Sequence, residues 1–121
     1  MRRRTVLIVE DDAQLRGMLR QALMFAGFLV EEASDGWNAL RRIDERPPDL
    51  VVLDLDLPIV HGLTVQQQIT AHARTRSIPI IIVTGSSESL DQVNVACILR
   101  KPISPEQVIE VIGECLRSGP G

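Results

Sequence analysis

Residues 48–58 read PDLVVLDLDLP, and the organisation of the whole chain can be worked out from this segment. Its run Leu50–Leu53 is continuously apolar rather than alternating between apolar and polar residues. Short continuous runs of valine and leucine are typical of strands that are buried on both faces, as in a parallel sheet. Asp54 and Asp56 follow this run directly, so we expect them at the carboxyl end of a buried strand.

Similar apolar runs recur on both sides of this segment, at Val6–Val9 and at Pro79–Val83. Two weaker runs, Phe28–Ala33 and Val95–Leu99, are candidates for flanking strands. Segments with apolar residues at three- and four-residue spacing separate the runs and predict helices. This alternation indicates an α/β fold in three layers, with helices on both faces of a doubly wound, five-stranded parallel sheet.

Ordinary start and stop signals bound four of the predicted helices, whereas residues 86–94 could form only a short helix or an irregular loop. Asp12 is expected to cap the first helix, and Gly27 to end it. The second helix is expected to start after residues 34–36 and to stop before Pro47, and the third to run from about Gly62 to Thr75. The last helix has Ser104 as its cap and Pro105 at its first position.

Polar residues follow four of the five predicted strands, at the edge where ligands bind in folds of this kind. Carboxylates that gather at one edge repel each other and raise each other's pKa values, and a hard cation such as Mg²⁺ relieves the repulsion. An aspartate there can also accept a phosphoryl group, which a lysine and a hydroxyl would stabilise. The residues in question are Glu10, Asp11 and Asp12, then Asp54 and Asp56, then Thr84, and finally Lys101.

Each of these residues, taken singly, also has an ordinary structural role. A lone aspartate, Thr-Gly or Lys-Pro after a strand is usually a cap or a turn, and for Asp12 the helix cap is the preferred interpretation. His61 and His72 show no metal-binding spacing and are interpreted as surface residues. The ordered set, rather than any one member, indicates a functional site.

The composition fits one small domain over residues 1–121, with residues 118–121 as a tail or the start of a linker. Of the 121 residues 45% are hydrophobic, and the net charge of −3 gives no footprint for nucleic-acid binding. Cys97 and Cys115 are isolated and are expected to be reduced core thiols. There is no signal-peptide core and no apolar run near the roughly 18 residues that span a membrane, so we expect a cytoplasmic protein.

In this order the residues resemble the response-regulator receiver domain family, the CheY-like superfamily. The resemblance covers residues 4–117, and it implies a flavodoxin-like fold with strand order 2-1-3-4-5. The matching segments read VLIVEDD at 6–12, PDLVVLDLDLP at 48–58, HGL at 61–63, PIIIVT at 79–84 and LRKP at 99–102.

The resemblance also implies a role for each residue at a matching position. Asp54 matches the phosphoacceptor, Thr84 the hydroxyl that turns toward the phosphoryl group, and Lys101 the lysine that pairs with it. The peptide bond from Lys101 to Pro102 is expected to be cis. The implied Mg²⁺ ligands are Asp11 directly, Glu10 through water, Asp54, and the backbone carbonyl of Asp56.

A receiver of this kind takes its phosphoryl group from the phosphohistidine of a sensor histidine kinase or a histidine phosphotransfer protein. The acyl phosphate then changes a surface that a downstream protein binds. The domain is expected to catalyse only its own phosphorylation and dephosphorylation, and to bind neither nucleic acid nor membrane. By the same resemblance, kinase recognition is expected on four residues of the first helix, Gln14, Arg16, Gly17 and Arg20.

The sequence departs from the family in the segment before the last strand. Ile98 occupies the position where the family usually has a switching aromatic residue, and the stretch from Thr84 to Lys101 is about five residues shorter than usual. The fold is therefore expected to have a shortened fourth helix. Asp56 is an extra carboxylate that could tighten metal binding or could disfavour the incoming phosphoryl group.

Three other interpretations stay open at this point. The chain could be a pseudo-receiver, which has the same fold but serves only as a docking module. Asp54-Leu55-Asp56 superficially resembles the nucleophile motif of haloacid-dehalogenase-like phosphatases, but those place it on their first strand in a longer chain. Finally, the domain could be part of a larger protein.

Overall fold

The computed structural model describes residues 2–118 and confirms the predicted α/β fold. Five parallel strands form one sheet in the order β2-β1-β3-β4-β5. Every residue of β3 and β4 is buried, as the continuous apolar runs predicted. The strands are β1 (Thr5–Val9), β2 (Leu29–Ala33), β3 (Leu50–Asp54), β4 (Ile80–Thr84) and β5 (Cys97–Arg100).

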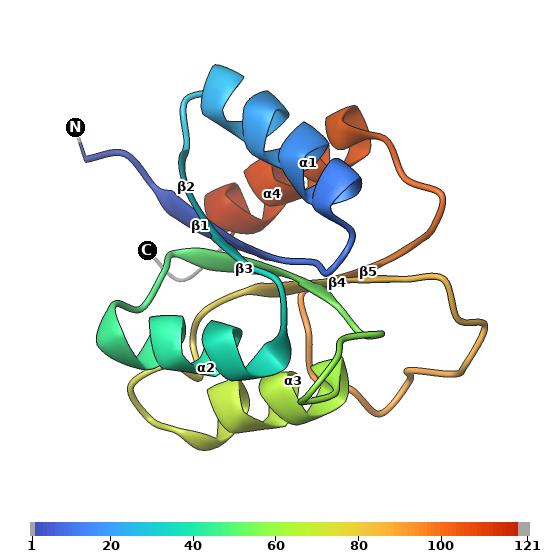
Figure 1. Cartoon of the computed structure of the whole chain (residues 1–121). Coiled ribbons are helices and arrows are strands. Elements are labelled where there is room, and N and C mark those ends of the chain that lie inside the picture. The colour runs from blue at the N-terminus through green and yellow to red at the C-terminus, as the bar shows by residue number, and fades with distance from the viewer. Residues whose placement is uncertain (1, 119–121) are drawn as a thin grey trace.

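Four helices cover the two faces of the sheet (Figure 1). Alternate residues of each strand point to opposite faces, so each face has its own hydrophobic core. One core packs under α1 and α4, around Leu19 and Val108, and the other packs under α2 and α3, around Ile43 and Val65. The helices are α1 (Ala13–Phe25), α2 (Gly36–Glu45), α3 (Gly62–Ala71) and α4 (Pro105–Ser118).

Most helix ends lie where the sequence predicted them. The Asp12 side chain accepts hydrogen bonds from the N–H groups of Gln14 and Leu15 at the start of α1. Gly27 has a φ of 101°, the left-handed conformation that ends a helix. Ser104 and Gln107 bond each other's backbone N–H groups, which makes a capping box for α4.

The third helix is shorter than the predicted range of 62–75. It ends at Ala71, because His72 has an extended backbone. The hydroxyl of the buried Thr75 donates to the carbonyl of Ile69 at 2.7 Å and so replaces a helical hydrogen bond. The start of α3 also holds a feature that the sequence did not reveal: Nδ1 of the exposed His61 accepts the N–H of Leu63 and caps the helix.

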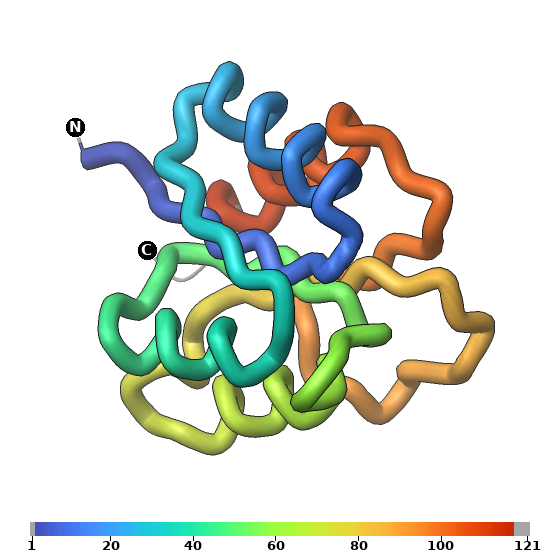
Figure 2. The backbone as a smooth tube through the Cα atoms, viewed as in Figure 1, coloured from blue at the N-terminus to red at the C-terminus, as the bar shows by residue number. Residues whose placement is uncertain are grey.

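The expected shortened fourth helix before the last strand is wrong: no helix forms between β4 and β5 in residues 85–96, and the segment is the irregular loop that the sequence also allowed (Figure 2). Leu90 anchors this loop, because its side chain is buried in the core under α2 and α3. The guanidinium of Arg100 donates to the carbonyls of Ser86 and Glu88, and the amide of the buried Gln66 donates to the carbonyl of Asn94. The loop is thus fixed from both ends.

The remaining sequence predictions on packing have mixed outcomes. Ile98 packs half-buried against the core under α2 and α3. Cys97 and Cys115 are free thiols, but each is only half-buried. Of the predicted tail, Ser118 is the last residue of α4, and residues 119–121 lie outside the described part of the chain. None of the helices in the described range is long and apolar enough to cross a membrane.

Ile59, in the loop between β3 and α3, has a strained backbone. Its φ is 70°, a conformation that is an outlier for a β-branched residue. The N–H of Val60 donates to the carbonyl of Pro58 at 2.8 Å across Ile59, the hydrogen bond of a γ-turn. Ile59 is 79% exposed, so its side chain gains little from packing that would offset the strain.

We therefore expect Ile59→Gly to raise the free energy of unfolding by about 1 kcal/mol, because glycine adopts positive φ without a steric penalty. Urea denaturation of both proteins measures the change. Ile59→Val keeps the β-branched strain and is the control, for which no stabilisation is expected. Equal stability of Ile59→Gly and the wild type would show that the turn is not strained.

Candidate functional site

Three carboxylates meet at the carboxyl ends of β1 and β3. Oxygen atoms of Glu10, Asp11 and Asp54 all lie within 4.8 Å of one another. Glu10 and Asp54 are almost completely buried, with 3% and 2% of their surfaces exposed, whereas Asp11 is exposed. The structure thus brings together the three acidic side chains that the sequence predicted as metal ligands, with one open side toward solvent.

The register of the central strands explains this proximity. Val9 pairs with Leu53 in the parallel ladder between β1 and β3, so the next residue of each strand, Glu10 and Asp54, ends up side by side. The N–H of Glu10 continues the pairing with β2 by donating to the carbonyl of Ala33 at 3.1 Å. The acidic cluster is therefore a consequence of where two buried strands end.

Lys101 reaches into the same cluster from the end of β5. Its Nζ lies 3.1 Å from Oε1 of Glu10 and 3.6 Å from Oδ2 of Asp54. Its backbone N–H donates to the carbonyl of Thr84 at 2.8 Å, and its peptide bond to Pro102 is cis, as predicted. Burial alone would lower the pKa of Lys101, but the hydrogen bond that its ammonium donates to Glu10 and the charge of Asp54 raise the pKa, so the side chain is an ammonium ion at neutral pH.

The surroundings of Glu10 change the protonation of its carboxylate. Burial raises its pKa to about 7, and the neighbouring charge of Asp54 adds to the rise. The N–H of Asp12, which donates to Oε2 at 3.1 Å, and the ammonium of Lys101 act in the opposite direction. In this arrangement the cluster holds more negative charge than Lys101 neutralises, which is the electrostatic condition for binding a cation.

Thr84 lies at the end of β4 and is completely buried. Its Oγ1 accepts the backbone N–H of Ser86 at 3.1 Å, so the hydroxyl is directed to the start of the β4–β5 loop. The backbone carbonyl of Thr84 thus accepts a hydrogen bond from Lys101, while its hydroxyl accepts one from Ser86 in the loop.

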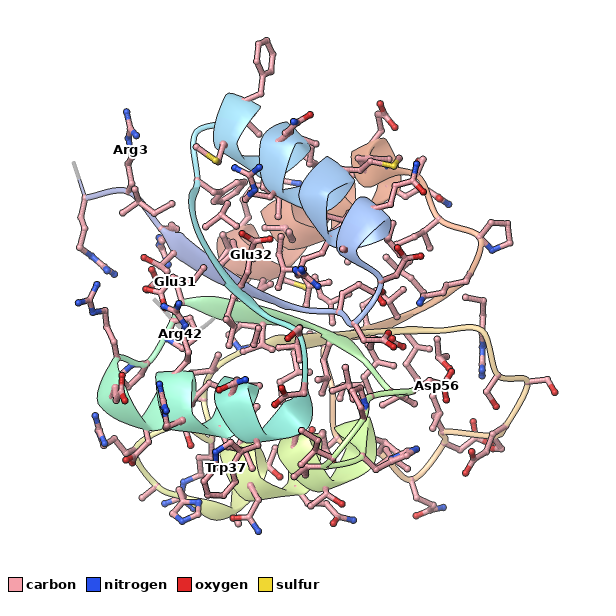
Figure 3. The ribbon with its side chains drawn as sticks, viewed as in Figure 1. Arg3, Glu31, Glu32, Trp37, Arg42 and Asp56 are labelled. Carbon is pink, nitrogen blue, oxygen red and sulfur yellow. The ribbon has the colours of Figure 1, made fainter. Side chains whose placement is uncertain are left out.

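Asp56 lies outside the carboxylate cluster. Its side chain is exposed, and its backbone N–H donates to Oδ1 of Asp54 at 3.1 Å. Figure 3 shows it on the loop that follows β3, at the carboxyl edge of the sheet. The contribution of its backbone carbonyl to a metal site stays a prediction.

The residues predicted for kinase recognition on α1 do not share one environment. Gln14 is exposed, whereas Arg16 is mostly covered and binds both Glu32 and the backbone of Glu10. Arg20 also pairs with Glu32. A groove of about 520 Å³ lies beside Lys101, between the start of α1 and the segment after β5, and Leu15, Met18 and Ile103 contribute its apolar lining.

The donor set suits Mg²⁺ rather than a softer metal. All three clustered ligands are carboxylate oxygens, which Mg²⁺ prefers, and Mg²⁺ usually takes one or two carboxylates and retains several waters. The exposed side of the cluster at Asp11 leaves space for those waters. Glu10, Asp11 and Asp54 thus fit the cation that the sequence predicted.

Comparisons with known proteins agree with this geometry. The family model for the response regulator receiver domain matches residues 6–113. The phosphate regulon transcriptional regulatory protein PhoB of Pseudomonas aeruginosa is 34% identical over 124 residues, covering 98% of this chain and 54% of PhoB. The chain spans about half the length of the curated relatives it matches.

Solved structures show the same fold. A CheY-like receiver domain protein from Methanospirillum hungatei superimposes with a TM-score of 0.87 at 28% identity, covering 96% of this chain and 95% of that one. The chemotaxis response regulator CheY4 of Vibrio cholerae gives a TM-score of 0.87 at 25% identity, covering 93% and 98%. The chain therefore has the same fold as these receiver proteins.

Proposed function

Because the chain belongs to the response regulator receiver domain family of two-component signalling, we propose that it accepts a phosphoryl group on Asp54. The observation that carries the proposal is the buried Asp54 carboxylate, which lies among Glu10, Asp11 and the ammonium of Lys101. Phosphoryl transfer needs a carboxylate acceptor and positive charge close to it. Asp54 is a buried carboxylate with the Lys101 ammonium at 3.6 Å, and the exposed Asp11 leaves one side of the cluster open to solvent.

Each residue of the site has a separate role in the proposed phosphoryl transfer. An Asp54 oxygen forms a bond to phosphorus, while the bond from phosphorus to the donor histidine nitrogen breaks and leaves its electron pair on the imidazole. Lys101 stabilises the negative charge on the phosphoryl oxygens, and the Thr84 hydroxyl rotates from Ser86 to donate to one of them. Mg²⁺ held by Glu10, Asp11 and Asp54, with the Asp56 carbonyl, would neutralise further charge at the same oxygens.

The domain acts on no substrate other than its own phosphoryl donor and its own acyl phosphate. Hydrolysis of the acyl phosphate returns Asp54 to a carboxylate, so the domain catalyses only its own phosphorylation and dephosphorylation. The exposed side at Asp11 gives both a donor histidine and water a route to Asp54.

We propose a sensor histidine kinase or a histidine phosphotransfer protein as the donor, in the cytoplasm. The groove beside Lys101 opens next to the acceptor and has an apolar lining, so it suits a helix of such a protein. The downstream partner is a protein surface rather than nucleic acid or membrane, because the chain has a net charge of −3.

A pseudo-receiver that only docks a partner is the second candidate, and two observations favour it. The segment between β4 and β5 forms no helix, and Ile98 replaces the usual aromatic residue. Neither observation concerns Asp54, Lys101 or the acidic cluster, so the two candidates differ in phosphoryl uptake.

The experiment is to incubate the protein with phosphoramidate, with Mg²⁺ or with EDTA, and to measure its intact mass. We expect a phosphate-sized mass gain only with Mg²⁺, and we expect hydroxylamine to remove it, because it cleaves acyl phosphates. A protein with an intact fold by circular dichroism that gains no mass, and does not bind beryllofluoride either, would be the docking module.

A further inference from the structure

The turn that carries Glu10 and Asp11 is held by Arg16, a residue of α1 that lies outside the acidic cluster. Nη1 of Arg16 donates to the backbone carbonyl of Glu10 at 2.8 Å. The backbone N–H of the same residue donates to the carbonyl of Asp12 at 2.9 Å. The second bond is the regular i to i−4 bond of the helix, so the side-chain bond to the Glu10 carbonyl is the contact that is specific to arginine.

The guanidinium of Arg16 is itself fixed by β2. Its Nε lies 3.3 Å from Oε1 of Glu32, and only 21% of the Arg16 side chain is exposed. Figure 3 labels Glu32, which lies on the side of the sheet that faces α1. The other oxygen of Glu32 pairs with Nε of Arg20 at 3.5 Å. A chain of contacts thus runs from β2 through Arg16 to the turn.

The position of Arg16 in its helix is unfavourable for the helix itself. Arg16 is the fourth residue of α1, whose N-terminus carries a partial positive charge and is stabilised by acidic rather than basic side chains. A surface ion pair with Glu32 contributes little on its own. Arg20, one turn later, also pairs with Glu32. Only Arg16 makes a charge-assisted hydrogen bond to the Glu10 carbonyl, so this contact distinguishes the two arginines.

We propose that Arg16 is a positioning residue for the divalent-cation site, and this rests on the proposed Mg²⁺ site. The hydrogen bond fixes the plane of the peptide between Glu10 and Asp11. Rotation of that peptide would move both carboxylates relative to Asp54. Arg16 thereby keeps the two carboxylates oriented toward one cation without touching it, and outer contacts of this kind typically change metal affinity by 10- to 100-fold.

The chain offers a matched pair of variants for the test, Arg16→Gln and Arg20→Gln. Both remove one positive charge from α1 and one ion pair with Glu32, but only Arg16→Gln removes the hydrogen bond to the Glu10 carbonyl. Titration calorimetry with MgCl₂ alone should show about tenfold weaker Mg²⁺ binding for Arg16→Gln. Arg20→Gln should change the affinity by less than about twofold. Equal Mg²⁺ affinities in the two variants would overturn the proposal.

A second measurement separates positioning from damage to the fold. In the phosphoramidate reaction, Arg16→Gln should need more Mg²⁺ for half-maximal labelling, yet should reach the wild-type rate at saturating Mg²⁺. A lower rate at every Mg²⁺ concentration would contradict a positioning role. If Arg16→Gln does not fold, Glu32→Gln releases the guanidinium from β2 and should weaken Mg²⁺ binding more than Arg20→Gln does; no difference would again overturn the proposal.

The two proposals fail in different ways. A wild-type protein that binds Mg²⁺ but gains no phosphoryl group would refute the proposed function, while the effect of Arg16 on Mg²⁺ affinity could still be measured. A wild-type protein that binds no Mg²⁺ would refute the role of Arg16, whatever its phosphoryl uptake.

Discussion

Asp54→Asn is expected to abolish phosphoryl uptake, with no mass gain under conditions that label the wild type completely. The amide group has nearly the same shape, and its oxygen can still accept the N–H of Asp56 that Oδ1 accepts at 3.1 Å. However, an amide is not a nucleophile toward phosphorus at neutral pH, and the remaining carboxylates have other partners. The intact masses of both proteins, incubated in parallel with phosphoramidate and Mg²⁺, measure the difference.

Asp12→Asn is the matched control for this variant. Asp12 is also an aspartate at the carboxyl edge of the sheet, but it is exposed and its carboxylate caps α1. Asparagine caps helices as well as aspartate does, so wild-type uptake is expected. A phosphate-sized mass gain in Asp54→Asn would show that another residue is the acceptor. Loss of uptake in Asp12→Asn would show that removing any one negative charge at this edge of the sheet is enough to prevent phosphoryl uptake.

The parts of the site that could be predicted from the sequence are those that depend on strand ends. In a parallel sheet all strands finish at the same edge, so a continuous apolar run locates the residue that follows it. This places Glu10, Asp54 and Lys101 together without any knowledge of side-chain conformation. The structure adds the distances, such as 3.1 Å from Lys101 to Glu10, and the burial that raises the pKa of Glu10.

The contacts that could not be predicted are those between a long side chain and a backbone carbonyl. Arg16 reaches the carbonyl of Glu10, and Arg100 reaches the carbonyls of Ser86 and Glu88. Such contacts leave no periodic pattern, and the sequence predicts for Arg16 only a role in kinase recognition. The signal that was available is its charge, because a basic residue in the first turn of a helix opposes the helix dipole.

Gly62→Ala is expected to lower the free energy of unfolding by about 3 kcal/mol, because the added methyl group has no space. Gly62 is the first residue of α3, and its N–H donates to the carbonyl of Leu55 at 3.0 Å. A Cβ at this position would lie 2.5 Å from Cα of Leu55 and 2.6 Å from the carbonyl oxygen of Asp54. Both atoms belong to the backbone, so no side chain can rotate away, and α3 must separate from the end of β3.

Gly17→Ala is the control that separates this steric effect from the general effect of replacing glycine. Gly17 lies inside α1, and a Cβ there would meet nothing within 4 Å. Alanine is the better helix former, so Gly17→Ala should be more stable than the wild type by about 1 kcal/mol. Urea denaturation gives both values. The displaced carbonyl in Gly62→Ala belongs to Asp54, the proposed phosphoacceptor, so the variant should also take up phosphoryl groups more slowly where it is still folded. If Gly62→Ala were as stable as Gly17→Ala, α3 would not pack closely against the end of β3. The explanation of how the fold holds Asp54 in place would then be wrong as well.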